Sequence, residues 1–338
     1  MLSRNRAVTK SKLYISDNKA GAVLLIIGLL TLLSGFTYLH FGRWAFVQVV
    51  EDFYANFGAE LVSIAITVLI IDYLNKCRQD VQLKAQLIRE MSSTENGFAR
   101  RAVGELGAHG WLTDGSLKGA DLEGANLRNA HLEKVNLERA NLEGTCLAAA
   151  NLVQANLGKA NLIKANLKEA ILFRSQLVEA RLQRSNLQQA GLFGARLEGA
   201  SLAEANLEGA NLEEAMLAKA DLIGVNLEGA RIAKANLGEA DLSKACLENA
   251  RLWQANLEGA TLWRANLQRA NLEGANLRDA DLAEANLAGA NLKNADLAGA
   301  DLDEAKLDSV RLKGAVHSRA TIWPNSFDPL DAGAILVD

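Results

Sequence analysis

The chain has 338 residues, of which 49% are hydrophobic but only 5% are aromatic, and both of its prolines, Pro324 and Pro329, lie near the C-terminus. This bias favours a repeat protein over a mixed globular fold. The formal net charge of −4 at pH 7 is too small to indicate a nucleic-acid partner, which usually requires a strongly basic chain.

Residues 1–19 form a basic N-terminus, and residues 20–41 contain no charged side chain when His40 is neutral. About 20 helical residues cross the hydrocarbon core of a bilayer. A cleaved signal peptide would usually have an apolar region of only about 7–15 residues and a small-residue cleavage site, and no such site stands out. We therefore predict an uncleaved transmembrane helix over residues 20–41.

A second apolar stretch covers residues 57–75, and it is weaker because it contains Glu60 and Asp72. Both carboxylates lie near its ends, where an ionised group reaches the headgroup layer; the alternative is a functional intramembrane carboxylate. The four aromatic residues in residues 42–56 are typical of an interfacial belt. We predict a second transmembrane helix over residues 57–75 and an aromatic extracytoplasmic loop over residues 42–56.

The flanking cations predict the orientation. Five lysines and arginines precede the first span and four follow the second, whereas the loop between them has only Arg43. By the positive-inside rule both ends of the hairpin face the cytoplasm. The chain is thus expected to be a two-span, multi-pass protein of the cytoplasmic membrane with its N-terminus and its repeats in the cytoplasm, which fits unpaired cysteines.

Residues 76–110 are interpreted as a helical neck and N-terminal cap. Apolar residues from Leu74 to Met91 recur at steps of three and four, interrupted by Lys84, which predicts an amphipathic helix leaving the membrane. Residues 92–97 break this pattern, and a second short helix is expected through Phe98, Ala102 and Leu106. Two alternatives remain for the apolar stripe, namely a coiled coil or a cover over the open end of the next domain.

From Leu112 to Leu312 every fifth position is leucine, at 40 of 41 places, with Ile232 as the exception. An α-helix turns about 100° per residue and would scatter these leucines around its axis, so a helix is excluded. In an extended backbone, leucine and the alanine two places before it face inward. The remaining two positions must turn a corner, which explains the glycines at positions 124, 144, 199, 209, 229 and 259.

The motif A-[DN]-L-x-x, as in "ADLEGANLRNA" and "ANLEGATLWRANL", resembles the pentapeptide repeat family. The resemblance covers residues 111–322 and implies a mainly β fold, a right-handed quadrilateral parallel β-helix of about ten coils with four repeats per coil. The α-helical hairpin and neck that precede it lie outside the resemblance. Outward asparagines are expected to bond along the rod. The predicted core includes Leu112, Leu122, Leu212, Ile232 and Leu312.

Residues 323–338 form a tail that breaks the period. Trp323 and Phe327 are expected to cover the last coil, and Trp111 the first, which would block end-to-end growth from an open sheet edge. A dimerisation surface at the C-terminal end, as some members of the family use, is the alternative.

A functional surface on a regular rod should show as a departure from the repeat. With 20 residues per coil, positions that differ by 20 stack in a column, and residues 159–197 carry seven cations against two acids. Exposed aromatics rimmed by arginines are typical of protein-docking surfaces. The predicted docking patch consists of Val153, Ile171, Phe173, Arg174, Arg181, Phe193 and Arg196. Neutral drift of outward positions is the alternative.

The sequence contains no Gly-rich phosphate loop, no nucleophile elbow and no carboxylate pair in a cleft. The cysteines, at positions 77, 146 and 246, and the four histidines lack the spacing of metal ligands. We therefore predict a protein that is not an enzyme and that uses no cofactor or metal ion.

The expected function is a membrane-tethered interaction scaffold whose rod binds an unidentified protein partner in the cytosol or membrane. The resemblance implies one alternative, because some cytosolic members mimic DNA and protect topoisomerase; residues 111–322, however, carry 24 basic and 28 acidic residues, far from the charge of a duplex. The other alternative is an accessory subunit of a membrane channel or transport complex, with Glu60 or Asp72 lining a path. Self-association is expected through the hairpin, the neck or the C-terminal cap.

Overall fold

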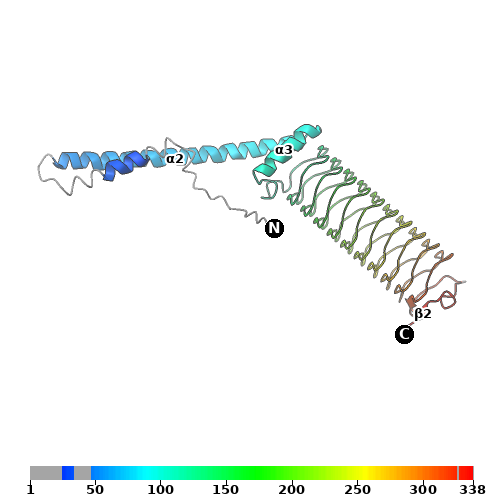
Figure 1. Cartoon of the computed structure of the whole chain (residues 1–338). Coiled ribbons are helices and arrows are strands. Elements are labelled where there is room, and N and C mark those ends of the chain that lie inside the picture. Colours follow the sequence, from blue (N-terminus) through cyan, green and yellow to red (C-terminus); the bar gives the residue numbers. More distant parts are fainter. Residues whose placement is uncertain (1–24, 34–46, 326, 338) are drawn as a thin grey trace, which may run out of the picture. The chain divides into compact units, whose positions relative to one another are not determined.

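The computed structural model describes residues 25–33, 47–325 and 327–337, with side chains described from residue 56 onward in the first long helix (Figure 1). The chain divides into two compact units, Met1–Ala85 and Gln86–Asp338. Helix α2 (Val47–Met91) begins in the first unit and ends in the second, which also contains α3 (Asn96–Ala108), the repeats, β1 (Val316–His317) and β2 (Ile335–Leu336).

In the first unit, helical residues 25–33 pack closely against α2. A Cβ atom added to Gly28 would lie 2.9 Å from Val62 Cγ2, and one added to Gly58 would lie 2.7 Å from Leu32 Cγ. The two glycines therefore permit an approach that larger residues would prevent. Residues 20–24 and 34–41 of the predicted first span, and residues 42–46 of the predicted loop, lie outside the described residues.

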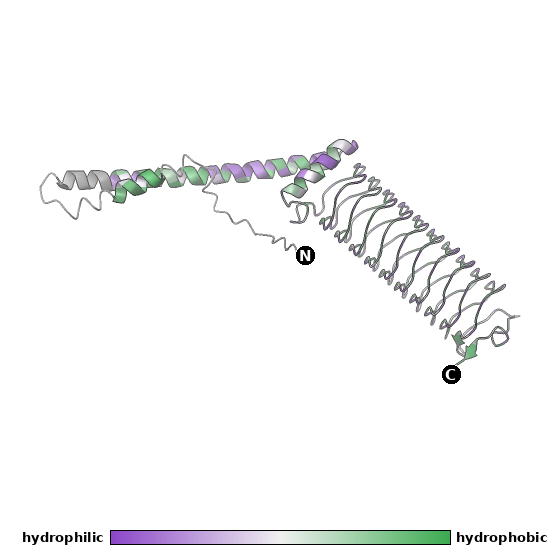
Figure 2. Ribbon diagram, viewed as in Figure 1, coloured by the Kyte–Doolittle hydropathy of each residue, from purple (hydrophilic) through white to green (hydrophobic). Residues whose placement is uncertain are grey.

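Helix α2 is longer than the predicted second span. It begins at Val47 because no glycine or proline interrupts residues 47–56, so the predicted loop of residues 42–56 is wrong over its helical part. Within the described residues one helical stretch, Asn56–Met91, is long and apolar enough to cross a membrane, with a mean hydropathy of 1.9. The hydrophobic colouring of α2 gives way to hydrophilic colouring towards α3 (Figure 2). Glu60 and Asp72 lie about 18 Å apart along the helix axis.

The repeats form a coil with a period of 20 residues. Parallel bridges join positions 20 apart, from Asp121↔Asn141 to Asp296↔Val316. Asn141 N–H donates to Ala120 O at 2.9 Å, and Leu122 N–H donates to Asn141 O at 2.8 Å, so each bridging residue bonds the coils on both sides. Four five-residue repeats therefore form the four walls of each turn.

The inward positions are filled as the sequence predicts. The five predicted core residues are at most 8% exposed, and the alanines of the repeats are buried beside them. Outward asparagines bond along the rod, as in the 2.9 Å bond from Asn276 Nδ2 to Asn256 Oδ1. Each corner is closed by a bond such as Ala125 N–H to Leu122 O at 3.1 Å. The six predicted corner glycines have φ between 62° and 64°.

Helix α3 covers the start of the coil. Its residues Ala99, Ala102, Val103 and Leu106 are at most 3% exposed, whereas Phe98 is 52% exposed and does not belong to the covered stripe. The carbonyl of Ser93 accepts a 2.8 Å bond from Asn126 N–H, as Ala125 O does for Cys146 N–H one coil later. Asn96 Nδ2 donates to the carbonyls of Asn126 and Arg128. Trp111 stacks on His109 at 4.3 Å beside the end of α3.

The C-terminal tail closes the other end of the coil. Strands β1 and β2 pair in parallel, with Val316 opposite Ile335. The predicted regular repeat to residue 322 is wrong by one residue, because Asp301 pairs with Ile322 rather than with Thr321. Buried Thr321 takes the inward position, where its hydroxyl donates to Leu297 O, while Ile322 is 50% exposed. Trp323 stacks on Phe327 at 5.3 Å and meets His317 edge-on at 5.6 Å, a cluster consistent with a cap.

Candidate docking surface

The 20-residue register decides which predicted site residues share a surface. We name each wall after one of its leucines, so that the Leu172 wall holds positions that differ from those around Leu172 by multiples of 20. The bridges Asn151↔Ile171↔Gly191 run along this wall. Gln154 N–H donates to Phe173 O, and one coil later Arg174 N–H donates to Phe193 O. The two phenylalanines therefore lie one above the other in one column of this wall.

Val153, Phe173 and Phe193 occupy one column of this wall, and Ile171 lies in the adjacent column; we call these four apolar residues the aromatic platform. Ile171 is 39% exposed and Phe173 42% exposed, while Val153 and Phe193 are half-buried. The platform replaces the asparagines and charged residues that occupy equivalent positions on most of the rod. A group of exposed apolar side chains surrounded by polar residues is typical of a protein-interaction surface.

Two glycines shape the platform, and sequence reasoning treated neither as such. Gly191 occupies an asparagine position, and a Cβ atom there would lie 2.5 Å from Phe173 Cε1. The ring of Phe173 therefore lies over Gly191, in space that a side chain there would fill, with its outer face exposed to water. In the same way the side chain of Arg174 lies over Gly194, 3.4 Å from where its Cβ atom would be. The sequence shows this feature as a bulky residue followed 18 to 20 residues later by a glycine, as in Phe173 with Gly191 and Arg174 with Gly194.

The predicted patch is too large, because two of its arginines lie on other walls. Arg181 belongs to the column Asn161↔Arg181↔Ser201, ten residues and two walls away from Ile171, so it lies on the opposite side of the coil. Arg196 belongs to the neighbouring wall, in the column Gln176↔Arg196↔Met216, and its guanidinium bonds Glu198 at 3.0 Å. The basic residues of segment 159–197 are neighbours in the sequence, but the coil distributes them over different walls.

Ion pairs on other walls neutralise part of the basic excess that residues 159–197 carry. Lys159 pairs with Glu179 at 3.3 Å, and Arg184 pairs with Glu204 at 2.8 Å. The hydrogen bond from Arg184 holds the pKa of Glu204 below its ordinary value. Among the described residues no ion pair involves Arg174, which leaves its guanidinium available beside the platform.

Other walls carry isolated exposed aliphatic residues that sequence reasoning missed. Met216 is 46% exposed on the Leu177 wall, and Ile223 is 41% exposed on the Leu182 wall. Neither has a phenylalanine in its column one coil before or after it. Met216 and Ile223 are therefore exposed apolar residues outside the platform.

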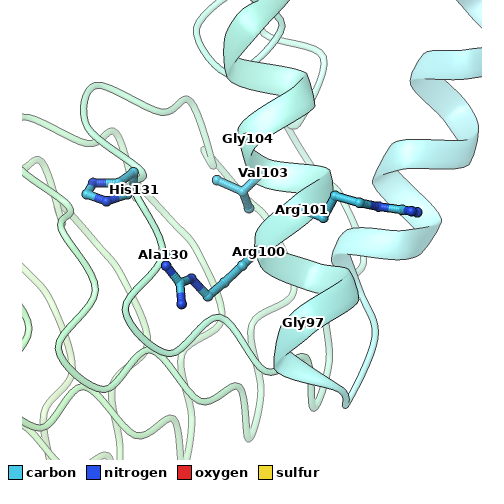
Figure 3. A pocket seen from close by; sticks show the side chains of 7 residues that line it. All are labelled: Gly97, Arg100, Arg101, Val103, Gly104, Ala130 and His131. Carbon is cyan, nitrogen blue, oxygen red and sulfur yellow. The ribbon is translucent and has the colours of Figure 1, made fainter.

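A separate pocket of about 350 Å³ lies between α3 and the first coil (Figure 3). Arg100 extends from α3 toward Ala130 and His131, whereas Arg101 points away from the coil and bonds Glu90 at 2.6 Å. Hydrogen bonds from Gln86 and Arg101 hold the pKa of Glu90 below its ordinary value. The lining of the pocket contains no Ser, Thr, Cys, Asp or Glu, and within the described ranges no three His, Cys, Asp or Glu side chains are placed to hold a metal ion.

Comparison with known proteins identifies relatives of the repeats. HetL from the cyanobacterium Nostoc sp. strain PCC 7120, a pentapeptide repeat protein involved in heterocyst differentiation regulation, is 40% identical over 59% of this chain and 83% of HetL, with a TM-score of 0.30. Rfr23 from the cyanobacterium Cyanothece 51142 is 44% identical over 29% of this chain and 63% of its own, with a TM-score of 0.19. QnrB1, a plasmid-mediated fluoroquinolone resistance protein, is 14% identical over 48% and 92%, with a TM-score of 0.23.

A search among curated proteins finds no match. The family model for pentapeptide repeats matches eight copies over residues 116–152, 150–189, 192–229, 235–274 and 275–314, which together cover more than half of the chain. The chain therefore belongs to the pentapeptide repeat family, whose members form right-handed quadrilateral β-helices.

Proposed function

We propose that this protein is a membrane-tethered, non-catalytic scaffold that binds a partner protein on the aromatic platform. The observation that carries the proposal is the fit of Phe173 over Gly191. Neutral drift would replace outward residues independently, whereas here a bulky ring and the loss of a side chain one coil later occur together. This pairing supports a surface selected for its flatness and its apolar character.

The charge beside the platform indicates the kind of partner. Arg174 lies over Gly194, beside Phe193, without an ion-pair partner among the described residues. A guanidinium at the rim of an apolar contact pairs with a carboxylate in a planar, two-bonded geometry. The partner is therefore a protein surface that presents apolar side chains next to an Asp or Glu.

The membrane tether is supported by the apolar part of α2. Ile64, Ile66, Ile70 and Ile71 are each between 46% and 52% exposed, and they lie between Glu60 and Asp72. A helix that exposes large aliphatic side chains all round is stable in lipid rather than in water. With the flanking cations on the inside, the repeats lie on the cytoplasmic side.

The rod surface gives no support to DNA mimicry. A mimic needs a continuous run of negative charge, but cations interrupt the acids along the walls, and some acids are paired with arginines, as in Glu213 with Arg231 at 2.7 Å and Glu248 with Arg269 at 2.7 Å. Paired groups present little net field to a basic partner.

The test is a quantitative pull-down of the tagged full chain from membranes solubilised in mild detergent. The platform variant Phe173→Glu with Phe193→Glu should lose at least about 90% of the specific partner signal, because charge at the centre of an apolar contact removes its binding energy. The control variant Met216→Glu with Ile223→Glu adds the same charge to other walls and should keep the partner.

Both variants should fractionate with membranes and melt at the temperature of the unchanged protein. Equal recovery of the partner by the two variants would show that the platform does not dock it. Recovery of the unchanged chain in the soluble fraction would remove the tether independently of the docking result.

A further inference from the structure

Helix α2 carries an apolar stripe beyond its lipid-exposed part, and none of the residues that the structure describes covers it. Leu74 is 58% exposed, Val81 is 68% exposed, and Cys77 between them is exposed as well. Lys76, Arg78 and Asp80 surround the stripe, which places this part of α2 in water rather than in lipid. Large aliphatic side chains exposed to water favour burial against a partner.

The stripe has the spacing of a coiled-coil seam. Leu74, Val81 and Ile88 are seven residues apart, while Cys77 and Lys84 occupy the positions three residues after the first two. These are the a and d positions of a heptad, and a seven-residue period keeps a seam facing another helix of the same period. A lipid-facing or randomly apolar helix has no reason to keep this period.

The seam is open only over a limited length. Leu87 and Met91 are at most 2% exposed, because they are buried at the start of the second unit. The open seam therefore extends from Leu74 to Lys84, about 15 Å along the helix. Two such short helices free in solution would not hold together. Chains held in one membrane meet at a far higher effective concentration, which makes a short seam sufficient.

We propose that this seam, Leu74 to Lys84, binds the same seam of a second copy of the chain as a parallel, in-register coiled coil. The inference rests on the tether of the proposed function, because a common membrane places every copy at the same height and in the same direction. Identical residues then meet, with Cys77 opposite Cys77. Lys84 at a core position weakens the seam and fixes its register. The dimer presents two aromatic platforms, so a bivalent partner binds with avidity.

Disulfide cross-linking of the full chain in its native membranes tests the proposal. In a Cys146→Ser, Cys246→Ser background only Cys77 remains, and mild oxidation should give a band of twice the chain mass on a non-reducing gel. The control moves the thiol two positions, in Cys77→Ser with Gln79→Cys. Since two residues turn a helix by about 200°, the control should cross-link at least about tenfold less.

Two further variants test the seam itself. Leu74→Asp with Val81→Asp should abolish the Cys77 cross-link while the chain remains in membranes, and Lys84→Leu should increase the cross-linked fraction. Equal cross-linking at positions 77 and 79, no cross-link at Cys77, or a Cys77 adduct with a different protein would each overturn the proposal. A cross-linked dimer found in the soluble fraction would overturn the tether while supporting the seam.

Discussion

The last residue before each inward alanine must adopt a positive φ, whatever its side chain. Lys134 has φ of 58° and Ala149 has φ of 54°, close to the 63° of Gly229. For a residue other than glycine this region costs about 1–2 kcal/mol. The rod accepts this cost at many corners because each coil adds backbone bonds to the coils on both sides and a buried layer of leucine and alanine. Glycine at a corner is therefore a local stabilising choice rather than a requirement.

The same added methyl group should have opposite effects at two glycines. A Cβ atom at Gly229 or at Gly104 would meet no atom within 4 Å, so sterics with neighbours cannot decide the outcome. Gly229→Ala should lower the local free energy of opening by about 1 kcal/mol, because φ is positive there. Gly104→Ala should raise it by about 1 kcal/mol, since Gly104 lies inside α3. Hydrogen–deuterium exchange of each segment measures both, and changes of the same sign would contradict the argument.

At the scale of elements, α3 acts as the cover of an otherwise open sheet edge. Its buried side chains and the carbonyl of Ser93 replace the coil that would precede the first one. An uncovered parallel edge is a template for pairing with another chain.

Truncation of the buried side of α3 tests this role. Leu106→Ala should destabilise the packing of α3 by about 2–5 kcal/mol, because Leu106 is fully buried. Phe98→Ala on the exposed side of the same helix should change it by about 0.5 kcal/mol or less. Exchange protection of the α3 amides reports both changes, and loss of protection in the Phe98 variant would show that the exposed face also holds the cap.

The coils could be predicted from the sequence because a single period determines them, whereas the ends could not. Leucine at every fifth position fixes which side chains face inward, and the structure has them there. The one-residue shift at Thr321 and the exposure of Phe98 depend on contacts between distant segments. The start of α2 at Val47 could have been predicted from the absence of glycine and proline in residues 47–56. The four aromatic residues of segment 42–56 favoured an interfacial loop instead.

At the scale of the whole molecule, the number of residues between two outward side chains determines whether they lie on the same wall of the rod. Residues 20 apart share a column, residues five apart lie on neighbouring walls, and residues ten apart lie on opposite ones. The sequence could place Phe173 and Phe193 together by this rule, and the same rule separates Arg181 from them. What the sequence could not provide is the direction of the Phe173 ring, which depends on the space above Gly191.

Deleting one repeat therefore tests the platform as a unit without removing any of its residues. Removal of residues 181–185 joins Ala180 to Asn186 in the normal repeat pattern but shortens the path from Phe173 to Phe193 from 20 residues to 15. Phe193 then moves to a neighbouring wall, while the inward leucines and alanines still stack. Removal of residues 201–205 joins Ala200 to Asn206 in the same way and leaves the platform intact. Both variants should keep the circular dichroism spectrum of the unchanged protein, and the first alone should lose the docked partner in the pull-down. In the first variant Phe173 and Phe193 no longer share a column. If this variant still bound the partner, binding would depend on one phenylalanine alone or on another surface.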